Sequence, residues 1–100
     1  MSNLVIAKTI QHQLMTLGRI KVWSWGAHAW AGGDYFLRFR VQGRKFRGIV
    51  KITLDPSDTY VIEFFKLKAL EPIKRYEMIY FDEMVDLIDE YVEKIDAYKF

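Results

Sequence analysis

Basic side chains gather in the middle of the chain, and their common chemistry is the binding of an anion. Six lysines and arginines, and no acidic residue, lie between Arg38 and Lys51. If residues 35–54 form a β-hairpin, alternation places four of these cations on one face: Arg38, Arg40, Arg47 and Lys51. Clustered lysines and arginines neutralise phosphates. The spacing therefore predicts an anion-binding face on a sheet.

Two tryptophans precede this segment and are candidate stacking platforms. Residues 19–25 alternate as in a strand, with Trp23 and Trp25 on the same side as Lys21. If Lys21 faces solvent, both tryptophans share the face that carries the arginines. Unpaired bases stack on such rings while the cations neutralise their phosphates. The alternative is that the tryptophans fill a small core, as large aromatic side chains usually do.

Groups that could catalyse a reaction are sparse. None of the serines or histidines lies in a nucleophile motif: Ser2, Ser24, Ser57, His12 and His28. His28 and Asp34 could orient one another, but no nucleophile is close in sequence. The chain has no cysteine, its histidines lack metal-ligand spacing, and its glycines match no phosphate-binding loop. We therefore expect a protein that is not an enzyme, with no cofactor and no metal site.

Charge is divided unevenly along the chain. Residues 1–55 carry nine Lys/Arg against two Asp/Glu, a net +7, and residues 56–100 carry six against eleven, a net −5. Half of the residues are hydrophobic, which excludes a disordered chain. No apolar run approaches the ~18 residues of a membrane span, and the first residues lack a secretory pattern. We expect one domain over residues 1–100, a cytoplasmic location and no membrane partner.

The segment that positions the cations is the predicted hairpin of residues 35–54. Gly43-Arg44 suits a two-residue type II′ turn, in which glycine takes the first central position. The predicted register pairs Val41 with Phe46, Phe39 with Gly48, Leu37 with Val50 and Arg40 with Arg47. One face is then apolar, and Phe39, Val41, Val50 and Ile52 are predicted to be buried. Like charges directly opposite are destabilising, so an Arg40–Arg47 pair favours an anionic partner.

Periodic segments surround the hairpin. Residues 4–17 have the spacing of an amphipathic helix, which Ser2 or Asn3 caps and a left-handed Gly18 ends. Residues 26–34 are expected to be a loop. Residues 59–67 read as a strand with Glu63 facing outward beside Lys51, and residues 73–81 as an edge strand or an extended segment. Residues 83–97 read as a helix that begins after an Asp82 N-cap. Its acidic stripe is Asp82, Asp86, Asp89, Glu93 and Asp96.

This order predicts a two-layer α+β domain: a helix, a three- or four-stranded antiparallel sheet and a second helix, with both helices on one face. The order resembles that of the double-stranded-RNA-binding domain. That family binds phosphate through lysines at the start of its second helix, where this chain has Asp82, Glu83 and Asp86. These acids suit the helix dipole and repel a nucleic-acid backbone. The resemblance is therefore confined to the order of elements.

Two functions agree with these patterns. The first is a small non-catalytic module that binds single-stranded nucleic acid through the outer face of the sheet. Its predicted contacts are Trp23, Trp25, Arg38, Arg40, Arg47 and Lys51. The alternative is a protein-interaction or self-associating domain, in which the acidic C-terminal helix contacts another protein or a second copy.

Overall fold

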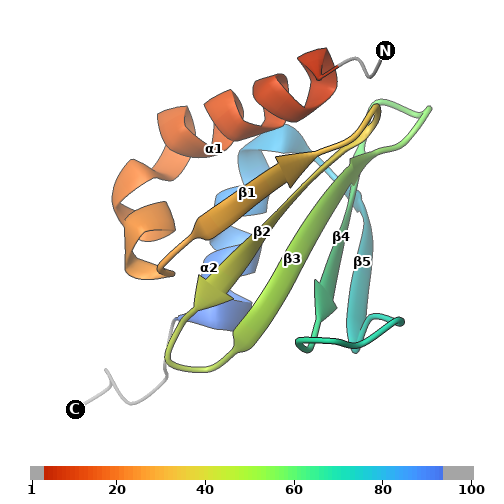
Figure 1. The fold of residues 1–100 in the computed structure, drawn as a ribbon. Coiled ribbons are helices and arrows are strands. Elements are labelled where there is room, and N and C mark those ends of the chain that lie inside the picture. Colours follow the sequence, from red (N-terminus) through yellow and green to blue (C-terminus); the bar gives the residue numbers. More distant parts are fainter. Residues whose placement is uncertain (1–3, 94–100) are drawn as a thin grey trace.

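The computed structural model describes residues 4–93, which form a five-stranded antiparallel sheet and two helices (Figure 1). The elements are α1 (Val5–Ser24), β1 (His28–Gly32), β2 (Phe36–Gln42), β3 (Arg47–Leu54), β4 (Tyr60–Phe65), β5 (Lys74–Ile79), the 3-10 turn η1 (Phe81–Glu83) and α2 (Met84–Val92). Strands adjacent in sequence are adjacent in the sheet. The α+β class is confirmed, but the sheet has five strands instead of three or four. None of the helices described has the length and apolar character needed to cross a membrane.

The additional strands lie at the two edges of the sheet. β1 occupies part of the segment expected to be a loop, and β5 shows that residues 73–81 include an edge strand. Each edge pairing contains a register shift, and β1 and β5 each have a residue at positive φ, Ala29 at 54° and Met78 at 56°. A bulge interrupts the two-residue alternation by which a strand is recognised in sequence. The edge strands were therefore harder to predict than the central ones.

Helix α1 extends beyond Gly18, and the strand predicted for residues 19–25 is wrong. Gly18 has non-helical dihedrals (φ −162°, ψ 52°), so it kinks the helix and does not end it in a left-handed conformation. A Cβ at Gly18 would lie 2.4 Å from Cγ1 of Val85, so the glycine permits α1 and α2 to approach closely. Beyond the kink, Val22 is buried. The predicted caps, Ser2 and Asn3, lie outside the described residues.

Helix α2 begins later than predicted. Phe81–Glu83 form a 3-10 turn, and the Tyr80 backbone N–H donates to the Glu83 carboxylate (3.0 Å), so Asp82 is not the N-cap. Acceptance of a backbone N–H by a side chain three residues later satisfies one of the donors that a helix start leaves free. The predicted extension to residue 97, including Asp96, lies outside the described residues.

One buried cluster joins the helices to the sheet. Alternate residues of each central strand contribute, which confirms the predicted burial of Phe39, Val41, Val50 and Ile52. The helical members are Ala7, Ile10, Leu14 and Val22 of α1 and Met84, Val85, Ile88 and Val92 of α2. Burial of this apolar surface is the main stabilising contribution in a domain of this size.

The β2–β3 hairpin has the predicted faces but not the predicted turn. Its loop has four residues, 43–46, closed by a hydrogen bond from the Gly43 N–H to the Phe46 carbonyl (3.0 Å). The observed pairs include Leu37 with Ile52, Phe39 with Val50, Arg38 with Lys51 and Arg40 with Ile49. The register differs by two residues, so each side chain keeps its face. The predicted Arg40–Arg47 pair is wrong.

Contacts with α2 explain the longer loop. The Val92 carbonyl accepts hydrogen bonds from the N–H groups of Lys45 (2.9 Å) and Phe46 (3.3 Å). The Phe46 ring is buried and packs edge-on against Phe64 and Tyr91, with centroids 5.8 and 5.3 Å apart. A two-residue turn would place Phe46 in the strand opposite Val41 and lose these contacts.

Replacement of Gly43 by alanine tests this contact. An added Cβ would lie 2.2 Å from the Val92 carbonyl oxygen, a backbone atom that cannot move without displacing α2. We expect Gly43→Ala to lower the free energy of unfolding by about 1–3 kcal/mol, the usual cost of overpacking. Urea denaturation measures the change. The exposed neighbour Gln42→Ala is the matched control and should shift stability by less than about 0.5 kcal/mol. Equal stability of the two variants would contradict the proposed packing.

Candidate functional site

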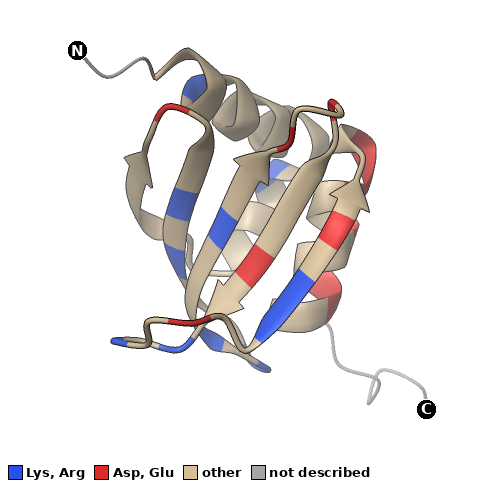
Figure 2. Ribbon diagram, turned by 90° about the vertical axis from the view of Figure 1, so that its right-hand side faces the viewer, with Lys and Arg blue, Asp and Glu red and all other residues tan. Residues whose placement is uncertain are grey.

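Four cations share the outer face of the sheet, which we define as the face opposite the buried cluster. Arg38 and Arg40 come from β2, and Arg47 and Lys51 come from β3, each alternating with buried neighbours. Figure 2 shows basic positions on adjacent strands of the sheet. The ion pairs found among residues 4–93 use none of these four side chains. The predicted grouping of the cations on one face is therefore present.

The observed register brings two of these cations directly opposite one another. Arg38 pairs with Lys51 across β2 and β3, so a like-charge pair exists at a different position from the one predicted. Lys51 is also opposite Glu63 of β4, as predicted, but the Glu63 carboxylate lies 3.7 Å from the Arg75 guanidinium. A bound anion near Arg38 and Lys51 would relieve the repulsion between them.

A groove of about 350 Å³ lies beside this pair. Its lining includes Phe36, Arg38, Ile49, Lys51, Phe65 and Leu70. An adjoining hollow of about 220 Å³ shares Arg38 and Ile49 and reaches Arg40. The groove volume falls within the ~300–1,000 Å³ of small-molecule sites, and an apolar lining with a few polar groups is typical of them. This arrangement can bind a group that is apolar on one side and anionic on the other.

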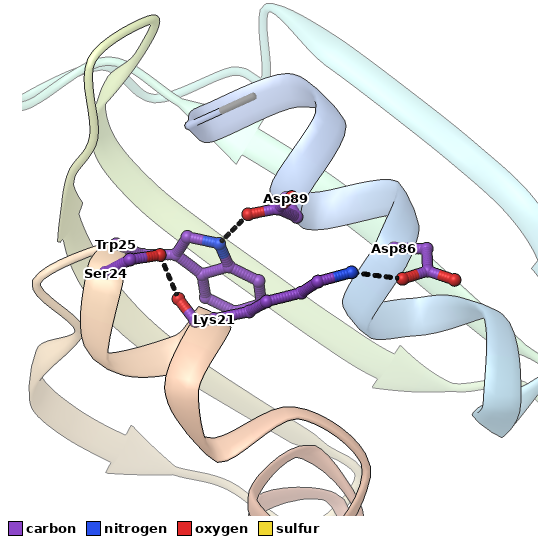
Figure 3. A network of polar contacts seen from close by, with 5 residues as sticks. All are labelled: Lys21, Ser24, Trp25, Asp86 and Asp89. Carbon is purple, nitrogen blue, oxygen red and sulfur yellow. Dashed lines mark hydrogen bonds and ion pairs between the residues drawn. The ribbon is translucent and has the colours of Figure 1, made fainter. Parts of the chain in front are cut away.

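The predicted tryptophan platforms are elsewhere. Trp25 is fully buried; its ring stacks on Phe39 (centroids 6.4 Å apart), and its indole N–H donates to the Asp89 carboxylate at 2.9 Å (Figure 3). Trp23 is 75% exposed, but it belongs to α1. The parity argument for both residues required a strand, and the segment is helical. The core alternative is correct for Trp25.

The acidic stripe is used within the chain. The Lys21 ammonium donates to Asp86 at 2.8 Å, near the Trp25–Asp89 hydrogen bond (Figure 3). The hydrogen bond that Lys21 donates to the Asp86 carboxylate raises the pKa of Lys21, so this amine stays protonated and is a poor nucleophile at neutral pH. At the other end of α2, the Glu93 carboxylate accepts the Arg44 N–H at 2.9 Å. These contacts join α2 to α1 and to the β2–β3 loop.

Other polar groups make local hydrogen bonds. His28 donates from Nδ1 to the Gly26 carbonyl at 2.7 Å. The N–H and hydroxyl of Ser57 both donate to the Asp55 carboxylate, which lowers the pKa of Asp55 and makes it a weaker base. No group of three or more histidines and acids in residues 4–93 could hold a metal ion.

Comparison with known proteins gives no assignment. No family model matches the chain, and neither a curated protein nor a solved structure matches it.

The apolar part of the groove was not predicted as a site. The sequence signal was that Ile49 and Phe65 occupy outward positions of their strands, where polar side chains are usual in an antiparallel sheet. Leu70 could not be placed, because the loop that carries it depends on the position of β5.

The Trp25–Asp89 hydrogen bond gives a second prediction. Asp89→Ala leaves a buried indole N–H without its acceptor, which should cost about 1–3 kcal/mol of stability. Asp86→Ala removes an exposed ion pair with Lys21 and should cost about 0–1 kcal/mol. Urea unfolding of both variants compares the two losses. A larger loss for Asp86→Ala would show that the exposed pair, and not the indole contact, joins the helices.

Proposed function

We propose that this protein is a small non-catalytic binding module whose outer sheet face binds single-stranded nucleic acid. The observation that carries the proposal is the set of four outer-face cations that take part in none of the ion pairs found among residues 4–93: Arg38, Arg40, Arg47 and Lys51. Two of them are directly opposite each other. An arrangement that repels itself in the free protein gains stability when an anion binds.

In this proposal both helices cover the same face of the sheet and leave the outer face open. The support is that the buried cluster contains side chains of α1 and α2 together with the strand residues that alternate with the cations, such as Phe39 and Val50. Successive residues of a strand point to opposite faces. A ligand would therefore reach the cations without disturbing the core.

The distribution of the cations favours an extended polyanion. Arg38 and Arg40 are two residues apart on β2, which separates them by about 6.8 Å along the strand. Arg47 and Lys51 extend the basic surface along β3. A single small anion could contact only part of this set, whereas a nucleic-acid backbone presents successive phosphates. Each phosphate neutralised on a single strand should contribute about −0.7 to the slope of log affinity against log salt.

An acidic cavity supports a second candidate function. A hollow of about 580 Å³ beside α2 has a lining with four acids and one cation: Asp82, Glu83, Asp86, Glu90 and Lys45, together with Tyr76 and Tyr91. Its charge suits a basic segment of another protein, or the outer face of a second copy. Sedimentation at low salt separates this function from nucleic-acid binding, because self-association would depend on protein concentration without added nucleic acid.

Charge reversal tests the first function. Arg40→Glu with Arg47→Glu should reduce the affinity for a labelled 12-nucleotide single strand at least about tenfold and lower the salt slope by about 1.4, for two lost phosphate contacts. The control is Lys8→Glu with Arg19→Glu, which makes the same charge change at exposed positions of α1. Fluorescence anisotropy at low salt measures binding, and thermal melting checks the fold. Equal losses in both double variants, or no binding by the unaltered protein, would refute the proposal.

A further inference from the structure

The loop between β4 and β5 holds a leucine at the edge of the groove without burying it. Leu70 is 96% exposed, yet it lines the groove together with Ile49 and Phe65. Contact with an apolar ligand would remove this side chain from water. Leu67 provides a comparison in the same loop, because it is 51% exposed and is not part of the groove lining.

The two phenylalanines of the groove differ in what their rings already contact. The Lys51 ammonium lies 4.6 Å from the centroid of the Phe36 ring. Gly33 packs against the same ring, since a Cβ on Gly33 would lie 2.2 Å from a Phe36 ring carbon. The ring and cation contacts found in residues 4–93 do not include Phe65, which is half-buried. Phe36 therefore positions Lys51, and Phe65 is available to a ligand.

The polar groups of the groove define the rest of the ligand. Arg38 and Lys51 line it, and they are directly opposite each other on β2 and β3. Arg38 can donate two hydrogen bonds to one phosphate, and Lys51 adds a second positive charge. A ligand that satisfies the groove thus has a flat apolar group next to a phosphate, which is the chemistry of a nucleotide.

We propose that the groove holds one unpaired nucleotide of the bound strand. The base lies between Phe65 and Leu70, over Ile49, and its phosphate lies at Arg38 and Lys51. This inference rests on the proposed function, because Arg40 and Arg47 hold the neighbouring backbone. A base within a duplex is already stacked and paired, so it does not enter the groove. Stacking on an aromatic ring tolerates every base, so we expect little sequence preference.

The test compares Leu70→Ser with Leu67→Ser. Leu70→Ser should weaken binding of the 12-nucleotide single strand about tenfold, the order expected when a bound base no longer buries one leucine side chain, and Leu67→Ser should not. Affinity for a 12-base-pair duplex and the salt slope should be the same in both variants, since the cations are unchanged. Because Leu70 is almost fully exposed, its replacement should preserve the fold. Phe65→Leu should repeat the selective loss.

A variant that should bind the strand more tightly gives an independent test of the nucleotide position. Leu70→Trp enlarges the stacking surface, so it should tighten single-strand binding, and emission from the added tryptophan should be quenched by the strand. Adenosine 5′-monophosphate should compete only weakly, because it lacks the contacts of the neighbouring phosphates.

The outcomes separate this inference from the proposed function. If Arg40→Glu with Arg47→Glu abolishes binding while the Leu70 and Phe65 variants bind normally, the outer face binds nucleic acid and the nucleotide position is wrong. If the unaltered protein binds no nucleic acid, both proposals are wrong. Three further results would overturn the inference. Leu70→Ser could weaken the binding of single strand and duplex equally, or the free nucleotide could bind more tightly than the strand. The third is that an acidic aromatic peptide displaces the strand at a lower concentration than a nucleotide does.

Discussion

The C-terminal end of α2 sets the geometry of the central hairpin. The last carbonyls of a helix lack partners within it, and here the Val92 carbonyl is satisfied by two N–H groups of the β2–β3 loop. Arg44 and Lys45 also place positive charge at the negative end of the helix dipole. Gly43 lacks the Cβ that would separate the loop from the helix. A loop held in this way has four residues, and its length determines which residues of β2 and β3 face one another.

Alternation along the sequence was enough to predict which side chains of the hairpin face the core, but it did not predict the register between β2 and β3. Alternation depends only on neighbouring residues, and a displacement of two positions leaves each side chain on its face, so the burial of Phe39 and Val50 was predicted correctly. The turn type was chosen from Gly43 and Arg44 alone, but contacts with Val92, far away in sequence, decide the loop. The same limit applies to residues 19–25, whose short alternating pattern also fits a helix in which Val22 is buried after the kink at Gly18.

The sequence predicted the cations of the candidate site, but it did not predict the apolar residues of the groove. Arg38, Arg40, Arg47 and Lys51 share a face because alternation is robust to the register change. The tryptophans were assigned to that face through a strand that does not exist. Phe65 and Ile49 were visible in the sequence as outward apolar residues, but Leu70 joins them only through a loop that leads to a bulged edge strand. Sequence periodicity contains no information on where such a loop lies.

The acids of α2 have partners within the described fold, whereas the ion pairs found there include none of the outer-face cations Arg38, Arg40, Arg47 and Lys51. The acids of α2 meet donors from elsewhere in the fold: Asp86 with Lys21, Asp89 with Trp25 and Glu93 with Arg44. These acids therefore stabilise contacts between helices and loop, and they do not neutralise the outer face. Arg38 and Lys51 remain directly opposite each other, and like charges at such positions are destabilising, while Lys51 also has Glu63 opposite it on β4. The packing of the hairpin overcomes this repulsion in the free protein. In the proposed function, an anion at the groove would reduce this repulsion, and that relief would contribute to the free energy of binding.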